Sequence, residues 1–149
     1  MTDINITIDE EKINVTAEKI VQMILPASSL GYISSNKQAG QDINGFRLVI
    51  LDGDGKLYYA DCTNPDHAGK LFGMSVKSVR AGDYVDVLLF GNWSDTSFNL
   101  IPGKTMFLGK EGYMVQSAPP DAEFIQPVGF AISQTELLLN IGEVYFVIK

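Results

Sequence analysis

The residues of this chain that are best suited to chemistry are its single cysteine and its single histidine, Cys62 and His67. They lie five residues apart in a polar stretch, where a thiol beside an imidazole could act as a nucleophile with its base. A catalytic pair of this kind usually comes from distant segments and also needs an oxyanion site. We therefore expect a half-buried cysteine, a surface histidine and no enzymatic activity.

A second candidate is the acidic turn Asp52-Gly53-Asp54-Gly55, whose two carboxylates could bind a hard cation such as calcium. A calcium loop of the EF-hand type also needs a third Asp or Asn, a following glycine and a distal Glu, but Lys56 and Leu57 follow here. Asp-Gly between apolar runs is typical of a hairpin turn, because both residues tolerate a positive φ. The pattern predicts a turn without a metal, and the absence of a glycine-rich phosphate cradle indicates no cofactor.

The composition predicts one domain or two small lobes. The chain has 149 residues, of which 46% are hydrophobic, and no run approaches the roughly 18 apolar residues of a membrane span. Without such a run we do not expect a membrane as a partner, and because the net charge of −7 would repel a phosphate backbone we do not expect nucleic acid either. A single cysteine allows no intrachain disulfide, and stability must therefore come from packing and association.

Residues 1–27 are predicted to form an extended arm and one short helix. Ile4, Ile6 and Ile8 alternate with polar residues, which is the period of a strand. Such an arm must pair with its own sheet or with the edge of a neighbouring subunit. Over residues 16–26 the apolar residues recur at helical spacing, although their β-branched side chains would also suit a strand.

The rest of the chain is predicted to be all-β, as a small barrel or sandwich, because short apolar runs alternate with turn residues. Residues 27–42 are rich in Ser and Gly and are predicted to be a loop around the short segment 32–33. Strands are predicted at 46–51, 57–61, 71–79, 84–90, 105–108, 113–116, 128–132, 136–141 and 144–148.

These strands fall into two similar series, which predicts two pseudo-repeated lobes, 28–91 and 92–149, that form one compact unit. The matched residues are Ile43 and Gly45 with Ile101 and Gly103 at an offset of 58, Leu51 and Gly55 with Leu108 and Gly112 at 57, Gly73-Met74-Ser75 with Gly129-Phe130-Ala131 at 56, and Val85-Asp86-Val87 with Leu139-Asn140-Ile141 at 54. Few of these pairs are identities, and any chain of strands and glycine turns shows part of this pattern. Both a true repeat and a generic β-pattern remain open.

Five apolar residues are candidates for a partner interface. They are Ile4, Ile6 and Ile8 in the arm, and Trp93 and Phe98 in the link between the two series. An exposed aromatic residue flanked by polar groups could anchor a sugar or a protein partner. The alternative is that Trp93 closes one end of a barrel.

Four stretches carry a resemblance to a known family. They are Ile6-Thr7 with residues 15–20, residues 45–61 around the acidic turn, residues 73–91, and residues 100–141 with Gly103, Leu108, Gly112, Pro120, Gly129, Ala131, Ser133, Thr135 and Leu137 in step. Together they resemble a group of small tailed-bacteriophage virion proteins over nearly the whole chain. The chain departs from the family pattern at Pro102 and in its longer N-terminal arm. The shared residues are turn glycines and strand apolars, and none is catalytic.

This resemblance implies a structural protein of the virion, made in the host cytoplasm and carried on the capsid surface. We expect a non-enzymatic decoration, or cement, protein that binds the major capsid protein and stabilises the assembled phage head as a homo-oligomer, a dimer or a trimer. The alternative is a tail-fibre or head-fibre module that binds a host-surface glycan through Trp93, Tyr58, Tyr59 or Tyr113. A small hydrolase that uses Cys62 is a third hypothesis and ranks below both.

Overall fold

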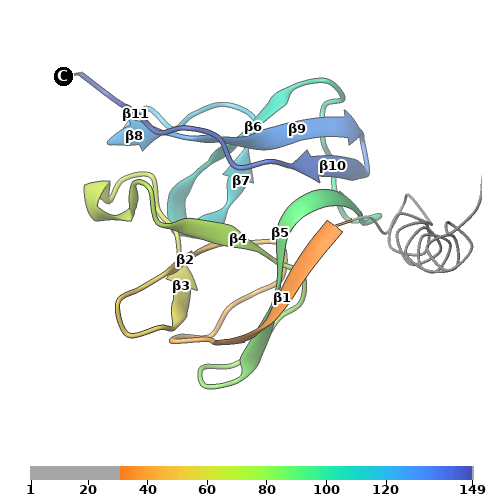
Figure 1. The fold of residues 1–149 in the computed structure, drawn as a ribbon. Coiled ribbons are helices and arrows are strands. Elements are labelled where there is room, and N and C mark those ends of the chain that lie inside the picture. The colour runs from red at the N-terminus through yellow and green to blue at the C-terminus, as the bar shows by residue number, and fades with distance from the viewer. Residues whose placement is uncertain (1–30, 149) are drawn as a thin grey trace, which may run out of the picture. The chain divides into compact units, whose positions relative to one another are not determined.

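Eleven β-strands and two short 3-10 helices make up residues 31–148, the part of the chain that the computed structural model describes (Figure 1). The strands are β1 (Gly31–Gln38), β2 (Leu48–Leu51), β3 (Leu57–Tyr59), β4 (Leu71–Ser75), β5 (Tyr84–Ser94), β6 (Thr105–Leu108), β7 (Met114–Val115), β8 (Phe124–Ile125), β9 (Pro127–Ser133), β10 (Glu136–Leu139) and β11 (Tyr145–Phe146), and the helices are η2 (Pro65–His67) and η3 (Lys110–Gly112). The all-β prediction is confirmed. The predicted arm, the short helix and the interface residues Ile4, Ile6 and Ile8 lie outside the described residues.

Nine of these strands form one curled antiparallel sheet in the order β3-β2-β4-β5-β10-β9-β6-β7, with β1 paired to β5. The remaining two, β8 and β11, form a small sheet of their own. In Figure 1 the first half of the described chain occupies the lower part of the view, the second half the upper part, and β5 reaches into both. The boundary predicted between residues 91 and 92 falls inside β5, and Gly31–Lys149 form one compact unit.

The sheet order contains a repeat, because β3-β2-β4-β5 is followed by its mirror order β10-β9-β6-β7. The hairpin of β2 and β3 pairs Leu51 with Leu57, and the hairpin of β6 and β7 pairs Leu108 with Met114. Both residues of the first pair therefore correspond to residues 57 positions later, which is the predicted offset for this hairpin.

The repeat includes a shift of register in the next pair of strands, which is β2 with β4 in the first half and β6 with β9 in the second. Val49 of β2 faces Gly73 of β4, and the register shifts at the following residue. Met106 of β6 faces Gly129 of β9, and the register shifts at the same point. The same register shift at corresponding positions of both halves supports the repeat, at offsets of 57 and 56.

Two of the predicted offsets are wrong. Met74 pairs with Leu88, and Phe130 pairs with Leu138, so β5 and β10 correspond at an offset of 50 and not 54. The cause is the second hairpin, where residues 134–135 replace the longer loop 76–83. At the start of the repeat, the amide of Phe46 donates to Ser75 O and the amide of Gly103 donates to Ala131 O, so the offset is 57 and not 58.

Apolar side chains from both halves form the main core, which is why the two halves make one unit. The fully or almost fully buried residues of this cluster are Leu48, Ile50, Ala60, Cys62, Met74, Leu88, Met106, Leu108, Ala122, Phe124, Val128, Ala131, Leu137 and Leu139. A smaller cluster around Ile43, Val49, Leu57, Val85 and Val87 lies within the first half. Burial of this apolar surface is the main source of stability for a chain with a single cysteine.

The loop predicted at residues 27–42 is wrong over Gly31–Gln38, which form the eight-residue strand β1. The strand is mostly exposed, and its centre is polar (Ser34 to Lys37), so the alternation that marks a half-buried strand is absent. Its structure comes from pairing with β5, for example Tyr32 with Phe90. The strand β8 is also absent from the predicted strands.

A candidate binding site between the two halves

A pocket of about 320 Å³ lies where the two halves of the described chain meet. Its lining comes from the entry to β2, the link after β5, the hairpin of β6 and β7, and β10. The lining residues are Gly45, Phe46, Arg47, Ser97, Phe98, Asn99, Leu100, Met106, Tyr113, Met114 and Leu137. Most of them are apolar, and Arg47 is the only charged residue among them, so the pocket offers an apolar interior and one fixed cation.

Phe46 forms part of the wall in a backbone conformation that is unfavourable for its residue type. Its φ is 61°, and the residue that corresponds to it in the repeat is Gly103, with a φ of 80°. A left-handed backbone costs a residue with a Cβ about 1–2 kcal/mol, and glycine avoids this cost. The first half therefore holds a strained phenylalanine where the second half has glycine, and its ring packs edge-on against Phe98 at a centroid distance of 5.0 Å.

Arg47 is held between two tyrosine rings. Its Cζ lies 3.6 Å from the ring centroid of Tyr113 and 4.9 Å from that of Tyr59. Nη1 donates to Glu111 O at 2.8 Å, and Nη2 donates to the Tyr113 hydroxyl at 2.6 Å. Within residues 31–148 no carboxylate forms an ion pair with this guanidinium. The side chain is rigidly positioned, and its charge is available to an anionic group.

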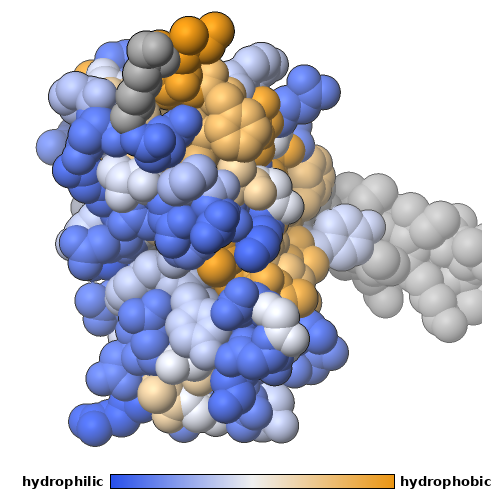
Figure 2. Space-filling model, turned by 90° about the vertical axis from the view of Figure 1, so that its left-hand side faces the viewer, coloured by the Kyte–Doolittle hydropathy of each residue, from blue (hydrophilic) through white to orange (hydrophobic). Residues whose placement is uncertain are grey.

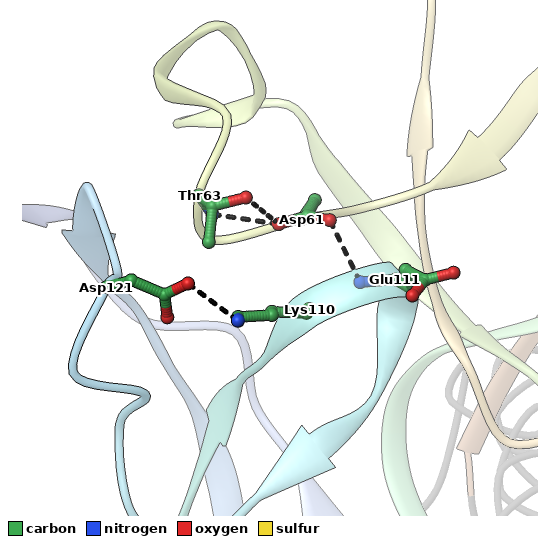
Figure 3. Close-up of polar contacts among 5 residues, drawn as sticks. All are labelled: Asp61, Thr63, Lys110, Glu111 and Asp121. Carbon is green, nitrogen blue, oxygen red and sulfur yellow. Dashed lines mark hydrogen bonds and ion pairs between the residues drawn. The ribbon is translucent and has the colours of Figure 1, made fainter.

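A polar cluster ties together the loops beside the pocket (Figure 3). Asp61 accepts hydrogen bonds from the Thr63 amide and hydroxyl at 2.8 and 2.6 Å, and from the Glu111 amide at 3.1 Å. Lys110 Nζ forms an ion pair with Asp121 Oδ2 at 2.6 Å. Burial raises the pKa of Asp61, but these hydrogen bonds outweigh it, and the net pKa lies below its usual range. Of these contacts, the hydrogen bond from the Glu111 amide to Asp61 joins the two halves, whereas the ion pair of Lys110 and Asp121 lies within the second half.

Cys62 and His67 do not form a catalytic pair. Cys62 is fully buried in the main core, whereas the sequence predicts a half-buried position. The Cys62 amide donates to Gly109 O and the Glu123 amide donates to Cys62 O, and these hydrogen bonds hold the loop against the core. Burial raises the pKa of its thiol, which disfavours the thiolate nucleophile. His67 is partly buried, its Nδ1 accepts from the Asp61 amide at 3.0 Å, and burial lowers its pKa. Both residues serve the packing of this loop.

The acidic stretch 52–55 forms the predicted turn. The Asp52 amide donates to Lys56 O at 3.0 Å, and Gly55 has a φ of 80°. Asp54 accepts from the Lys56 amide at 2.9 Å and from the Tyr58 hydroxyl at 2.5 Å, and the tyrosine hydrogen bond is the main cause of its lowered pKa. Over the described residues, no group of three or more His, Cys, Asp or Glu side chains could hold a metal ion.

The two predicted interface residues that the structure describes differ in their relation to the pocket. Phe98 lines it, whereas Trp93 does not and packs, partly buried, against the main core opposite Leu137. The sequence reasoning missed Phe46 and Arg47. The signal that could have found Phe46 is the repeat itself, which sets a phenylalanine against a turn glycine once the offset is 57.

Exposed apolar side chains outside the pocket mark a second surface. Tyr145, Phe146, Val147 and Ile148 are consecutive and have exposed fractions of 57, 64, 37 and 96%. Figure 2 shows apolar atoms gathered at the upper end of the face on which this segment lies. Contiguous exposed apolar surface is typical of a protein–protein interface.

No protein-family model matches this chain, and a search of curated proteins finds no significant match. No helix within residues 31–148 is long and apolar enough to cross a membrane.

Proposed function

We propose that the chain is a non-enzymatic structural protein of a tailed-phage virion, a decoration protein that binds and stabilises the assembled head. The observation that carries this proposal is the exposed apolar segment Tyr145–Ile148 on a rigid β-scaffold, because such a surface suits attachment to another protein. The resemblance to tailed-phage virion proteins is the reason for assigning the chain to a virion, and the proposed partner is the major capsid protein.

The mechanism is stabilisation by binding. A protein that binds the assembled shell and has no affinity for the free subunits shifts the equilibrium toward intact particles by mass action. Several copies, as dimers or trimers, would bridge neighbouring capsid subunits and oppose the outward pressure of packaged DNA. The cost of ordering is small, because the strands of the described part are already fixed by the core.

The test uses particles made without this chain. We expect electron microscopy of these particles to lack one regularly repeated external density, and addition of the purified full chain to restore it. A Phe146→Ser variant should restore less of the density than Tyr84→Ser, a matched control at a residue of β5 that is 62% exposed. External densities that are identical with and without the chain would contradict the proposal, and a few copies per particle would indicate a tail or fibre position.

The second candidate, a fibre module that binds a host-surface glycan, is favoured by the pocket. Phe98 and Tyr113 offer aromatic faces there, and Asn99 offers an amide. Trp93 does not line the pocket, so Tyr113→Ala is the sharper variant. Saturable binding on a glycan array that is lost in Tyr113→Ala and kept in Trp93→Ala would support this function over decoration.

A further inference from the structure

We infer that the pocket between the two halves receives one apolar side chain, aromatic or aliphatic, that stands next to a carboxylate in a protein partner. The inference rests on the proposed function in one respect, that the ligand belongs to a protein. It adds to that function the chemistry of the recognised group and the residues that recognise it.

The lining of the pocket accounts for the preference for an apolar side chain. Phe46, Phe98, Met106 and Met114 surround a space of about 320 Å³, enough for one large side chain. Methionine side chains adapt their shape to an inserted group, which suits a pocket of this kind. The polar side chains of the lining are those of Arg47, Ser97, Asn99 and Tyr113, and the Tyr113 hydroxyl already accepts from Arg47, so an apolar group fits the larger part of the lining.

Arg47 accounts for the preference for a neighbouring carboxylate. The molecule has a net charge of −7, so the positive charge of Arg47 at the pocket is a distinct recognition feature. Two tyrosine rings and two hydrogen bonds fix its position, and within residues 31–148 it has no carboxylate partner. Arginine and tyrosine are the residue types enriched among the strongest contributors to protein binding. A carboxylate beside the inserted side chain would complete the ion pair.

The strain at Phe46 is an independent observation that points to the same place. The repeat shows that glycine satisfies this backbone position, with a φ of 80° at Gly103, yet Phe46 occupies it with a φ of 61°. Strained residues that persist are concentrated at binding and active sites, where the strained side chain has a role. Here the retained ring forms the pocket wall with Phe98.

The test titrates the full chain with two small probes of nearly equal shape, 3-phenylpropanoate, which carries a carboxylate, and 3-phenylpropanamide, which carries a neutral amide. The methionine methyl groups, labelled with carbon-13, report binding by NMR. Met106 and Met114 line the pocket, and Met74, which is fully buried in the core, is the internal control. We expect saturable shifts of the two pocket methionines by the carboxylate, at least about fivefold weaker binding of the amide, and no shift of Met74.

Variants of the two key residues complete the test. Arg47→Gln should remove the preference for the carboxylate, and Arg47→Lys should keep part of it. Phe46→Gly should weaken both probes, and it should melt no lower than Phe46→Ala, because glycine relieves the left-handed backbone. A lower melting temperature for the glycine variant would overturn the strain argument.

Three outcomes would overturn the inference. They are equal affinity for the two probes, no shift of either pocket methionine, and shifts produced by an acidic monosaccharide such as glucuronate but not by 3-phenylpropanoate. A fourth outcome, full restoration of the particle density by Arg47→Gln, would also overturn the inference, because the pocket would then have no part in attachment, although decoration would stand. If the unmodified chain itself binds no heads, the proposed function fails, and the probe titration still decides the chemistry of the pocket.

Discussion

At the scale of single residues, polar side chains in this protein mostly complete the loops around the core. The Asp61 carboxylate accepts hydrogen bonds from the amides of Thr63 and Glu111, and His67 Nδ1 accepts one from the Asp61 amide. These residues looked chemically suggestive in the sequence because acidic residues, a cysteine and a histidine stand close together. The structure gives each of them a hydrogen-bond partner or a place in the core, and this is the usual fate of polar groups near buried backbone.

The stability of the protein should depend on pH through His67, the only histidine of the chain. Burial lowers its folded-state pKa below the unfolded value of about 6.5, so protons bind the unfolded chain more tightly. The stabilisation is complete above that unfolded pKa and is lost as the pH falls through the folded pKa. We expect the free energy of unfolding, measured by urea titration, to decrease from pH 7 to pH 5. A His67→Gln variant that keeps the same decrease would contradict this assignment.

At the scale of elements, the repeat depends on two glycines where strands approach closely. A Cβ on Gly129 would lie 1.9 Å from Leu138 O, and one on Gly73 would lie 2.4 Å from Leu88 O. The two positions correspond in the repeat, because each pairs with the preceding hairpin strand, and each also approaches the backbone of the strand that follows. The sequence showed these glycines as a matched pair, and the structure adds the reason for them.

Alanine at either position should therefore be strongly destabilising. We expect Gly129→Ala and Gly73→Ala each to lower the free energy of unfolding by more than about 2 kcal/mol, because the added methyl group collides with backbone that cannot move. Gly53→Ala is the matched control, since its Cβ would meet no atom within 4 Å, and it should change stability by less than about 0.5 kcal/mol. Equal effects of all three substitutions in a denaturant titration would refute this explanation.

At the scale of the whole described unit, the two halves share one core and one strand. Leu48, Met74 and Leu88 of the first half pack in the same cluster as Leu108, Phe124 and Leu137 of the second. Strand β5 belongs to the first half in sequence, yet it pairs with β10 of the second. Neither half can cover its apolar face without the other.

Separated halves should consequently fail to fold. We expect fragments 28–94 and 95–149, which keep β5 intact, to show no cooperative unfolding by circular dichroism, whereas the full chain unfolds in a transition that involves both halves. Mixing the two fragments should restore part of the native signal, because the shared core can form again. A cooperative transition in either isolated fragment would show that the halves are independent domains.

The sequence by itself determined most of the strands and the turn at Asp52–Gly55, and it indicated a repeat without deciding between a true repeat and a generic β-pattern. These features follow from local rules, since alternation, Asp-Gly turns and bulge glycines act over a few residues. Such local rules do not predict strand β1, because an exposed strand with a polar centre is fixed by pairing with its partner strand β5 and not by its own pattern.

Only the tertiary structure decided which strands are neighbours, that β5 joins both halves, and that Cys62 is buried. It also decided the pocket, where Phe46 and Arg47 meet Phe98 and Tyr113 from segments about 50 to 70 residues away along the chain. The physical reason is the same in each case. Pairing, burial and a shared cavity are properties of contacts between distant segments, and a linear pattern does not specify those contacts.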